Sequence, residues 1–327
     1  MQDQTASETP SYSRRHSNPP VLNPAADKDN HTNVWTHPEV GRIYRNTEHV
    51  TAALVPPLLD ACGLTEEAIA SLKRPIEVLD MCCGAGVVSA QIQTILKRTG
   101  MANKGMVKLT CSDSSAGQME YVKNRIQADG WVDSKVVKGD ISCLPFESNS
   151  FDFVVVGAAL MVVADPYTGL SELFRILKPG GRLATSTWGH EGWVAATCGA
   201  FADLSLPNQK PVPWPQESSD MTRLWSPGKW ECDRFTAAMY NAAGFADVRS
   251  DTIPSPLLSF DSAEHFCTAY QTLHFGVMEK YWSKEQKEKL SPLLAETFIK
   301  YLRKKYDGGP FGFERSTVIA SGTKPLK

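Results

Sequence analysis

A strand, a glycine-rich turn and a helix are encoded together in residues 75–89, and this unit limits the folds open to the chain. The stretch reads Pro-Ile-Glu-Val-Leu-Asp-Met-Cys-Cys-Gly-Ala-Gly-Val-Val-Ser. The apolar run 76–79 ends in Asp80, and apolar residues then recur at helical spacing as far as Gly100. This order is typical of the unit that opens a nucleotide-binding α/β sheet. We therefore expect a ligand at the turn, because such sheets bind ligands at the carboxyl ends of their strands.

The residues of the turn indicate which class of ligand it could bind. Gly84 and Gly86 lack a Cβ atom and so let a ligand approach the backbone closely. A dinucleotide fingerprint needs a third glycine where Ser89 stands, and a P-loop needs a Lys-Ser/Thr pair that the stretch lacks. The pattern Leu-Asp-x-x-Cys-Gly-x-Gly, which carries Asp80, resembles motif I of class I S-adenosylmethionine (SAM) dependent methyltransferases. Taken alone, the stretch also fits a tight turn without a ligand.

A second acid at a strand end follows at a spacing suited to a ribose. The predicted strand over 106–113 ends in Asp113, 27 residues after Gly86, and the next helix stops at Gly130. A carboxylate only accepts hydrogen bonds, so it can bind both hydroxyl groups of a ribose. Asp113 is therefore a predicted ribose ligand. Capping of the helix over 115–129 is an alternative role that is compatible with the first.

Two further predicted strands, over 135–141 and 151–157, are joined by a loop with a second family pattern. Residues 139–152 read Gly-Asp-Ile-x-x-Leu-Pro-Phe-x-x-x-x-Phe-Asp, which closely resembles the methyltransferase pattern between strands three and four. The resemblance implies that Asp140 accepts a hydrogen bond from the adenine amino group. It also implies that Ile141 packs on the adenine ring.

A third family pattern, Glu-Leu-Phe-Arg-Ile-Leu-Lys-Pro-Gly-Gly, occupies residues 172–181. Pro and Gly form a strong stop, so we expect the helix over 166–177 to end there and the fifth strand to follow over 182–188. The phrase is close to one found before strand five in small-molecule methyltransferases of the ubiquinone-biosynthesis type. The resemblance covers about residues 35–260.

The chain is thus identified as a member of the class I methyltransferases, and the resemblance implies SAM as cofactor. Motif I departs from its commonest form, which has Gly at the first position, at Cys82 and Cys83. Tyr44 is predicted to contact the methionine end of SAM, although packing in the core is an alternative. The cofactor-binding residues implied are Tyr44, Asp80, Cys82, Gly84, Gly86, Asp113, Ser114, Met119, Asp140, Ile141 and Gly157. No metal site is expected.

The fold class that follows is α/β, a Rossmann-like doubly wound sheet of seven strands, mostly parallel with an antiparallel last strand. N-terminal helices and a helical cap complete it. The expected order is a disordered polar tail (1–33), N-terminal helices covering the cofactor site (34–74), the SAM-binding core (75–202), a Pro/Trp-rich lid loop (203–231), a helix and strand six (232–260), a cap of two helices at about 262–282 and 284–305 (261–310), and the last strand and tail (311–327).

Charge, cysteine content and hydropathy narrow the class of protein. The net charge of −2 gives no basic surface for nucleic acid. The eight cysteines are scattered without a C-x-x-C pair, which favours a reduced intracellular protein over a disulfide scaffold or a zinc site. No apolar run approaches the roughly 18 residues of a membrane span, and the polar N-terminus is unlike a signal peptide. We expect a soluble cytoplasmic protein, either a monomer or a homodimer.

Methyl transfer needs an acceptor atom in line with the methyl group at about 3 Å, in a dry pocket. A hydroxyl or amine acceptor must also lose a proton, which a histidine could take. His190, just after the fifth strand, is the predicted base, with a structural role as its alternative; the weaker candidates are His37, His49, His265 and His274. The residues predicted to line the substrate are Ala158, Met161, Trp188 and Trp193.

These features predict a methyltransferase for a hydrophobic small molecule, with O-methylation as the first choice. The chain resembles enzymes of fungal natural-product pathways in this respect. N-, S- or C-methylation, a protein acceptor, and a SAM-binding regulator or cyclase without methyl transfer stay open as alternatives. Ser89 and the Gly-Asp-Ile loop argue against a nicotinamide-dependent dehydrogenase.

Overall fold

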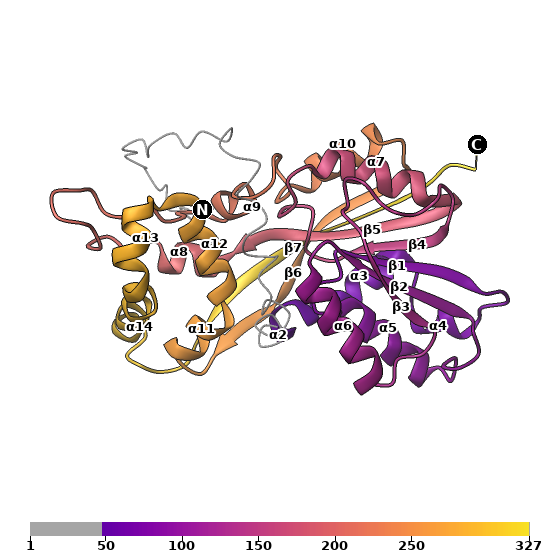
Figure 1. The fold of residues 1–327 in the computed structure, drawn as a ribbon, viewed down its shortest axis with the longest axis horizontal. Helices are drawn as coiled ribbons and strands as arrows, with labels where there is room; N and C mark the ends of the chain where they lie inside the picture. Colours follow the sequence, from indigo (N-terminus) through magenta and orange to yellow (C-terminus); the bar gives the residue numbers. More distant parts are fainter. Residues whose placement is uncertain (1–47, 327) are drawn as a thin grey trace, which may run out of the picture.

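Seven strands form one sheet in a computed structural model that describes residues 48–326 (Figure 1). Their order across the sheet is β3-β2-β1-β4-β5-β7-β6, and β7 runs antiparallel to both of its neighbours. The strands are β1 (Ile76–Met81), β2 (Val107–Asp113), β3 (Ser134–Lys138), β4 (Phe151–Val156), β5 (Leu177–Glu191), β6 (Ala246–Phe260) and β7 (Phe311–Thr323). The predicted fold class is confirmed. The expected polar tail, Tyr44 and His37 lie outside the described residues.

The central strands are buried because helices cover both faces of the sheet, as their continuous apolar runs indicate. In parallel register Asp80 of β1 lies beside Cys111 of β2 and Val155 of β4. The carboxyl ends of these strands therefore meet at one edge of the sheet. Both Asp80 and Asp113 stand at that edge, which fixes where a ligand site can form.

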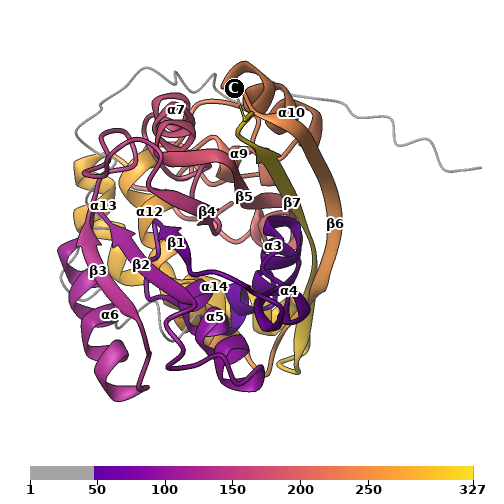
Figure 2. The same ribbon diagram turned by 90° about the vertical axis from the view of Figure 1, so that its right-hand side faces the viewer.

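Two hydrophobic clusters hold the helices against the sheet. On one face lie side chains of α3, α5 and α6, and on the other lie those of α7 and α10. Figure 2 shows these groups on opposite sides of the sheet. The helices are α3 (Val55–Cys62), α4 (Glu66–Ala70), α5 (Val87–Arg98), α6 (Ala116–Ala128), α7 (Pro166–Ile176) and α10 (Asp233–Ala242). The short α2 (Glu48–Ala52) precedes them and lies between the sheet and the cap (Figure 1).

Strands β5, β6 and β7 are much longer than the others and run out of the sheet into a helical cap (Figure 1). The cap contains α8 (Gly192–Thr197), α11 (Ala263–Ala269), α12 (Gln271–Tyr281), α13 (Lys284–Leu290), the 3₁₀ turn η2 (Ser291–Leu293) and α14 (Leu294–Lys305). The prediction of two long cap helices was wrong at two points. Tyr270 separates α11 from α12, and η2 separates α13 from α14, because Pro292 lacks the N–H group that a continuous helix needs.

The cap has an aromatic core. The His274 ring stacks on Phe298 with centroids 4.3 Å apart, and Phe266 packs against both Tyr270 and Phe298. The Pro/Trp-rich segment 203–231 joins this core. Its three tryptophans are buried, and a short helix within it, α9 (Ser218–Thr222), faces the sheet. The tryptophans of the predicted lid loop therefore act as packing residues.

All eight cysteines are free thiols. Over residues 48–326, no three or more His, Cys, Asp or Glu side chains gather in a way that could hold a metal ion. Over the same range, every helix is too short or too polar to cross a membrane.

Candidate functional site

A cavity of about 280 Å³ lies at the carboxyl edge of the sheet, between the sheet, α2 and the cap. Most of the predicted site residues line it. They are Asp80, Cys82, Gly84, Asp113, Ser114, Asp140, Ile141, Gly157, Ala158, Trp188 and Trp193. The cavity therefore joins the predicted cofactor end to the predicted substrate end in one space.

The glycine-rich turn after β1 is shaped by three residues with positive φ. They are Cys82 (56°), Gly84 (53°) and Gly86 (80°). A Cβ atom on Gly86 would stand 2.9 Å from the Trp131 ring, so only glycine lets the turn pack this closely against that ring. A Cβ atom on Gly84 would meet nothing closer than 3.9 Å, which leaves its backbone open to a ligand. Cys82 adopts the left-handed conformation at the position where the family most often has Gly.

Asp113 ties the turn to the end of β2. Its Oδ2 accepts a hydrogen bond from the Gly84 amide at 3.0 Å, and its Oδ1 accepts one from the Ser115 amide at 2.9 Å. Each carboxylate oxygen keeps a further lone pair, and the side chain lines the cavity. The side-chain N-cap of α6 is Ser115, whose Oγ accepts from the Gln118 amide, so Asp113 does not supply that cap. Burial raises the pKa of Asp113.

Asp80 presents one carboxylate oxygen without a partner. Its Oδ2 accepts from the Ser89 amide at 3.0 Å and from the Ser89 hydroxyl at 2.6 Å. Its Oδ1 is buried and has no hydrogen-bond partner among residues 48–326, although the side chain lines the cavity. Burial raises the pKa of Asp80 to about 7. Ser89, which replaces the third glycine of a dinucleotide site, thus holds a carboxylate whose other oxygen needs a donor or a cation.

At the far end of the cofactor region, Asp140 and Ile141 follow β3. Asp140 is exposed, and its Oδ1 accepts from both the amide and the hydroxyl of Ser142. Ile141 is buried and packs against Gly169 of α7, where a Cβ atom would come within 3.2 Å of it. Both residues line the cavity beside each other, as an adenine site requires.

Four predicted site residues lie away from the cavity lining. Gly86 faces Trp131, while Met119 and Met161 are buried in the packing around the sheet. His190 is exposed, and its Nδ1 lies 3.4 Å from the Ser218 hydroxyl. The structure therefore gives no support to His190 as the base.

A β-bulge explains the position of His190. In a regular strand Ser186, Trp188 and His190 would share a face, but the pairing of β5 with β7 shifts between Trp188 and Glu191. Ser186, Trp188 and Glu191 line the cavity instead. The bulge thus turns the histidine to solvent and puts a carboxylate in its place.

Glu191 forms an ion pair with Arg315, and neither residue was predicted from the sequence. Arg315 stands directly opposite it on β7, and its Nε donates to Glu191 Oε1 at 3.2 Å. The two side chains are only 5% and 2% exposed, yet both residues line the cavity. The sequence gives no clear signal for Arg315, because it stands in a polar run of β7 between Glu314 and Ser316. Its partner could not be read from the sequence either.

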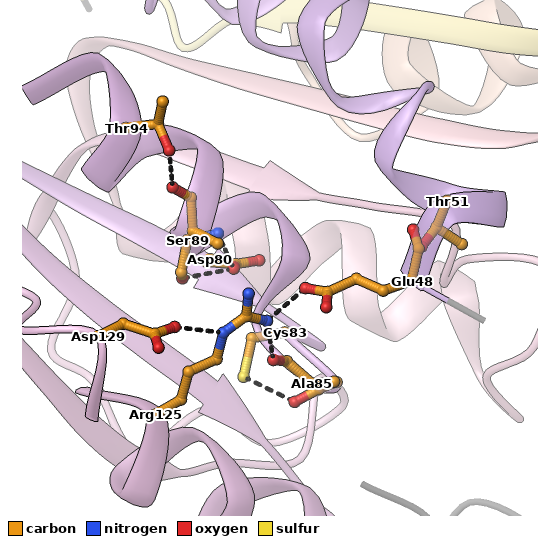
Figure 3. Close-up of polar contacts among 11 residues, drawn as sticks. Glu48, Thr51, Asp80, Cys83, Ala85, Ser89, Thr94, Arg125 and Asp129 are labelled. Atoms are coloured by element: carbon orange, nitrogen blue, oxygen red, sulfur yellow. Dashed lines mark hydrogen bonds and ion pairs between the residues drawn. The ribbon is translucent and has the colours of Figure 1, made fainter. Parts of the chain in front are cut away.

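Helix α2 covers the cavity and is held from two sides. The Arg315 Nη1 donates to the Val50 carbonyl at 2.8 Å. On the other side the Arg125 guanidinium lies between Glu48, Asp129 and the Ala85 carbonyl (Figure 3). Arg125 thereby links α2 to the glycine-rich turn. Val50 and Thr51 of α2 line the cavity; the predicted N-terminal contact, Tyr44, lies before the described residues.

The chain is similar in sequence to known proteins. Residues 64–191 match the model of the ubiE/COQ5 methyltransferase family. The chain is 32% identical over 282 residues to methyltransferase tpcH of Aspergillus fumigatus, an alignment that covers 85% of this chain and 95% of that protein. The chain belongs to the class I SAM-dependent methyltransferases. SAM is the cofactor of this methyltransferase.

Two more distant similarities accompany the family match. The methyltransferase is 26% identical over 294 residues to the acetylaranotin bis-thiomethyltransferase of Aspergillus terreus, which covers 90% of this chain and 97% of that protein. Among solved structures, the YcgJ protein of Bacillus subtilis aligns with a TM-score of 0.49 and 16% identity, over 81% of this chain and 98% of that chain.

The residues at the cavity fit SAM. The Oδ1 of Asp80, which has no hydrogen-bond partner among residues 48–326, suits an ammonium group. The spare lone pairs of Asp113 suit the two hydroxyl groups of a ribose. The open backbone at Gly84 leaves room between them. The methyltransferase would thus hold the methionine end of SAM near Asp80, its ribose at Asp113 and its adenine near Asp140 and Ile141.

Proposed function

We propose that this methyltransferase transfers a methyl group to a hydroxyl group of a hydrophobic small molecule. The observation that carries the proposal is the apolar part of the cavity lining, to which the cap contributes. Its side chains are Val162, Val163, Trp188, Trp193, Met221, Ala269 and Leu273. Such a chamber favours an apolar acceptor by burying its surface. Three of the four acceptor contacts predicted from the sequence line the cavity, namely Ala158, Trp188 and Trp193.

SAM supplies a methyl group that its sulfonium already activates, so the chain has no covalent intermediate to form. Its residues act by binding and orientation. The Asp80 and Asp113 carboxylates hold the cofactor at the sheet edge, and Trp188 on β5 lines the same cavity. An acceptor bound against the tryptophans would be held near the methyl group with water excluded, which lowers the barrier to in-line transfer.

S-methylation is a second candidate. It is favoured by the similarity to a protein whose name describes methylation of thiols, an alignment over 90% of this chain. A thiol acceptor would use the same apolar chamber, and it would need less help to lose its proton because thiols are more acidic than alcohols and most phenols.

The similarity to proteins of two Aspergillus species supports a place in fungal secondary metabolism. We propose a small molecule as the acceptor and a cytoplasmic location, and we propose no role in binding nucleic acid. The last point rests on the net charge of −2, which provides no basic surface for phosphates.

Two measurements test the function. Calorimetric titration with SAM, S-adenosylhomocysteine and NAD should give binding of the first two and none of the third. Incubation with methyl-labelled SAM and matched hydrophobic phenols, thiols and amines should then label the phenols. Label on thiols alone would replace O-methylation by S-methylation. SAM binding without label on any acceptor would contradict methyl transfer to small molecules of these classes.

A further inference from the structure

We propose that Glu191 is the catalytic base of methyl transfer and that Arg315 stabilises the anionic acceptor that proton removal creates. This inference rests on the proposed function, because it concerns a hydroxyl acceptor. It assigns the role first predicted for His190 to the neighbouring residue that the β-bulge turns into the cavity.

The position of the pair is the first argument. Glu191 lies on the same strand as Ser186 and Trp188, and all three line the cavity. Ser186 Oγ accepts from the Ala158 amide at 3.0 Å, which places Ser186 at the end of β4, beside the cofactor region. Glu191 is farther along β5, toward the apolar chamber. A carboxylate there faces the space that an acceptor would occupy.

The hydrogen-bonding capacity of Glu191 is the second argument. Arg315 donates to Oε1, and the neighbouring Trp193 side chain also favours the ionised carboxylate. An ionised carboxylate offers about four lone-pair sites. The arginine therefore holds its orientation and leaves capacity to accept the proton of an acceptor hydroxyl. A carboxylate that is oriented by a neighbour and lines a cavity has the arrangement expected of a general base.

Electrostatics give the third argument. Burial raises the pKa of Glu191, whereas Arg315 on β7 and Trp193 on α8 oppose that rise by favouring the ionised form. Burial makes a carboxylate a stronger base, and the arginine keeps it charged. A buried ion pair adds little to stability when its desolvation cost is counted, so stability alone is a weak reason for charges in this wall.

Arg315 keeps N–H donors that can face the acceptor. Its Nε and Nη1 bond Glu191 and the Val50 carbonyl, and no partner for Nη2 occurs within residues 48–326. When Glu191 takes up a proton its charge is lost, and the guanidinium is left to face the acceptor oxygen. Arg315 can then stabilise that oxygen as negative charge develops on it.

The chemical balance is simple. The acceptor O–H bond breaks and its proton passes to the Glu191 carboxylate, while the acceptor oxygen forms a bond to the methyl carbon. The bond between that carbon and the cofactor sulfur breaks, and S-adenosylhomocysteine leaves as a neutral thioether. Glu191 then returns the proton to water. No oxidant or further reactant is needed.

The test measures how kcat depends on acceptor acidity. Wild type, Glu191→Gln and the control Glu314→Gln are assayed with hydrophobic phenols of graded pKa, from alkylphenols to nitrophenols that are ionised at the assay pH. Glu314 is the neighbour of Arg315 on β7 and is exposed. We expect E191Q to lose about 10²- to 10⁴-fold in kcat on the weakly acidic phenols and far less on the ionised ones. E314Q should match wild type, and SAM affinity should stay within twofold in both.

The opposite outcomes are distinct. Equal losses for E191Q across all phenols would make Glu191 structural, and no loss would remove it from the reaction; either result overturns the inference while the proposed function stands. If E191Q does not fold, the variant Glu191→Gln/Arg315→Met, which leaves no unpaired buried charge, should lose at least as much on weakly acidic phenols. Wild-type rates in it would overturn the inference. Failure of wild type to methylate any phenol would contradict the proposed function itself.

Discussion

Trp188 and Glu191 face the same cavity although three positions separate them on β5. Side chains three apart on a regular strand point to opposite faces. The bulge between them restores a common face, and Gly189 permits it, since a Cβ atom there would stand 2.7 Å from the Ser316 hydroxyl. The direction of the Glu191 side chain thus depends on a local irregularity of the strand.

The first prediction concerns His190. His190→Ala should leave kcat within about twofold of wild type, because the imidazole is exposed and outside the cavity lining. Steady-state kinetics with the best labelled acceptor measures it. A loss of tenfold or more, with SAM affinity unchanged, would return His190 to the reaction and argue against its placement here.

The second prediction concerns Asp113. Asp113→Ala removes the acceptor for the Gly84 and Ser115 amides and for the ribose hydroxyl groups, so the cofactor loses charge-assisted hydrogen bonds. We expect SAM affinity to fall by about 100-fold or more, since each such bond contributes about 1.5–3 kcal/mol. Calorimetry measures the affinity, and circular dichroism checks that the fold is retained. Glu120→Gln, an exposed change on helix α6, which follows β2, is the control. Unchanged affinity in D113A would refute the ribose assignment.

The third prediction uses the raised pKa of Asp80. In the free protein its carboxyl has a pKa of about 7 and lies beside Ser89 and the charge of Asp113. A bound ammonium group favours the ionised form, so SAM binding should release close to one proton at pH 6, and this release should fall as pH rises toward 8. Affinity should therefore weaken by up to tenfold for each pH unit below 7.

Calorimetry in buffers of different ionisation enthalpy measures this release directly. Asp80→Asn keeps the shape of the side chain but cannot titrate, so its affinity should be lower and nearly independent of pH between 6 and 8. Equal proton release in wild type and in D80N would exclude Asp80 as the titrating group.

The fourth prediction concerns stability in acid. Burial among aromatic rings lowers the pKa of His274 to about 3, well below its ordinary value near 6.5. Below pH 6.5 the unfolded chain gains a proton that the folded chain does not, so His274 reduces the unfolding free energy as pH falls toward 3. The slope is at most about 1.4 kcal/mol per pH unit.

Urea unfolding of wild type and His274→Leu at several pH values tests this. Asp80 has the opposite sign, because its raised folded pKa makes the fold gain stability as pH falls from about 7 to 4. That contribution is common to both proteins and cancels in their difference. The difference in unfolding free energy should shift in favour of H274L as pH falls, and a constant difference would contradict a buried neutral His274.

The fifth prediction concerns the attachment of α2. Arg125→Met removes the donors to Glu48 and to the Ala85 carbonyl, so α2 should separate more readily from the glycine-rich turn (Figure 3). The Arg125 and Glu48 side chains are half-buried, and we expect SAM to dissociate about tenfold faster, which corresponds to ~1.4 kcal/mol. Stopped-flow displacement measures the rate. Lys123→Met, an exposed change on α6, should leave it unaltered.

The α/β fold class and the cofactor edge could be predicted because they depend on local patterns and on one rule of parallel sheets. Asp80 and Asp113 stand at the ends of the buried strands β1 and β2, Asp140 follows β3, and strands of one direction end at one edge. The acids of that edge were therefore identifiable residue by residue. The family could be inferred from the motifs and their spacing, without knowledge of the tertiary packing.

The acceptor end could not be predicted in the same way. The bulge before Glu191 depends on pairing with β7, more than a hundred residues away, and a shift of one residue exchanges the two faces of a strand. Met161 follows β4 as expected, but packing turns it into the core. The interruption at Tyr270 could not be predicted either, because the helical spacing around it is continuous. It lies where the Phe266 and Tyr270 rings stack.

The long strands have a mechanical consequence. Backbone pairing between β6 and β7 runs from Ala246↔Thr323 to Phe260↔Phe311, so one hydrogen-bonded ribbon belongs to both the sheet and the cap. A hinge between the two lobes would have to bend or break that ribbon. We therefore expect the sheet and the cap to keep their relative positions during turnover. Acceptor and product would then enter and leave by movement of α2, which Arg125 and Arg315 hold in place.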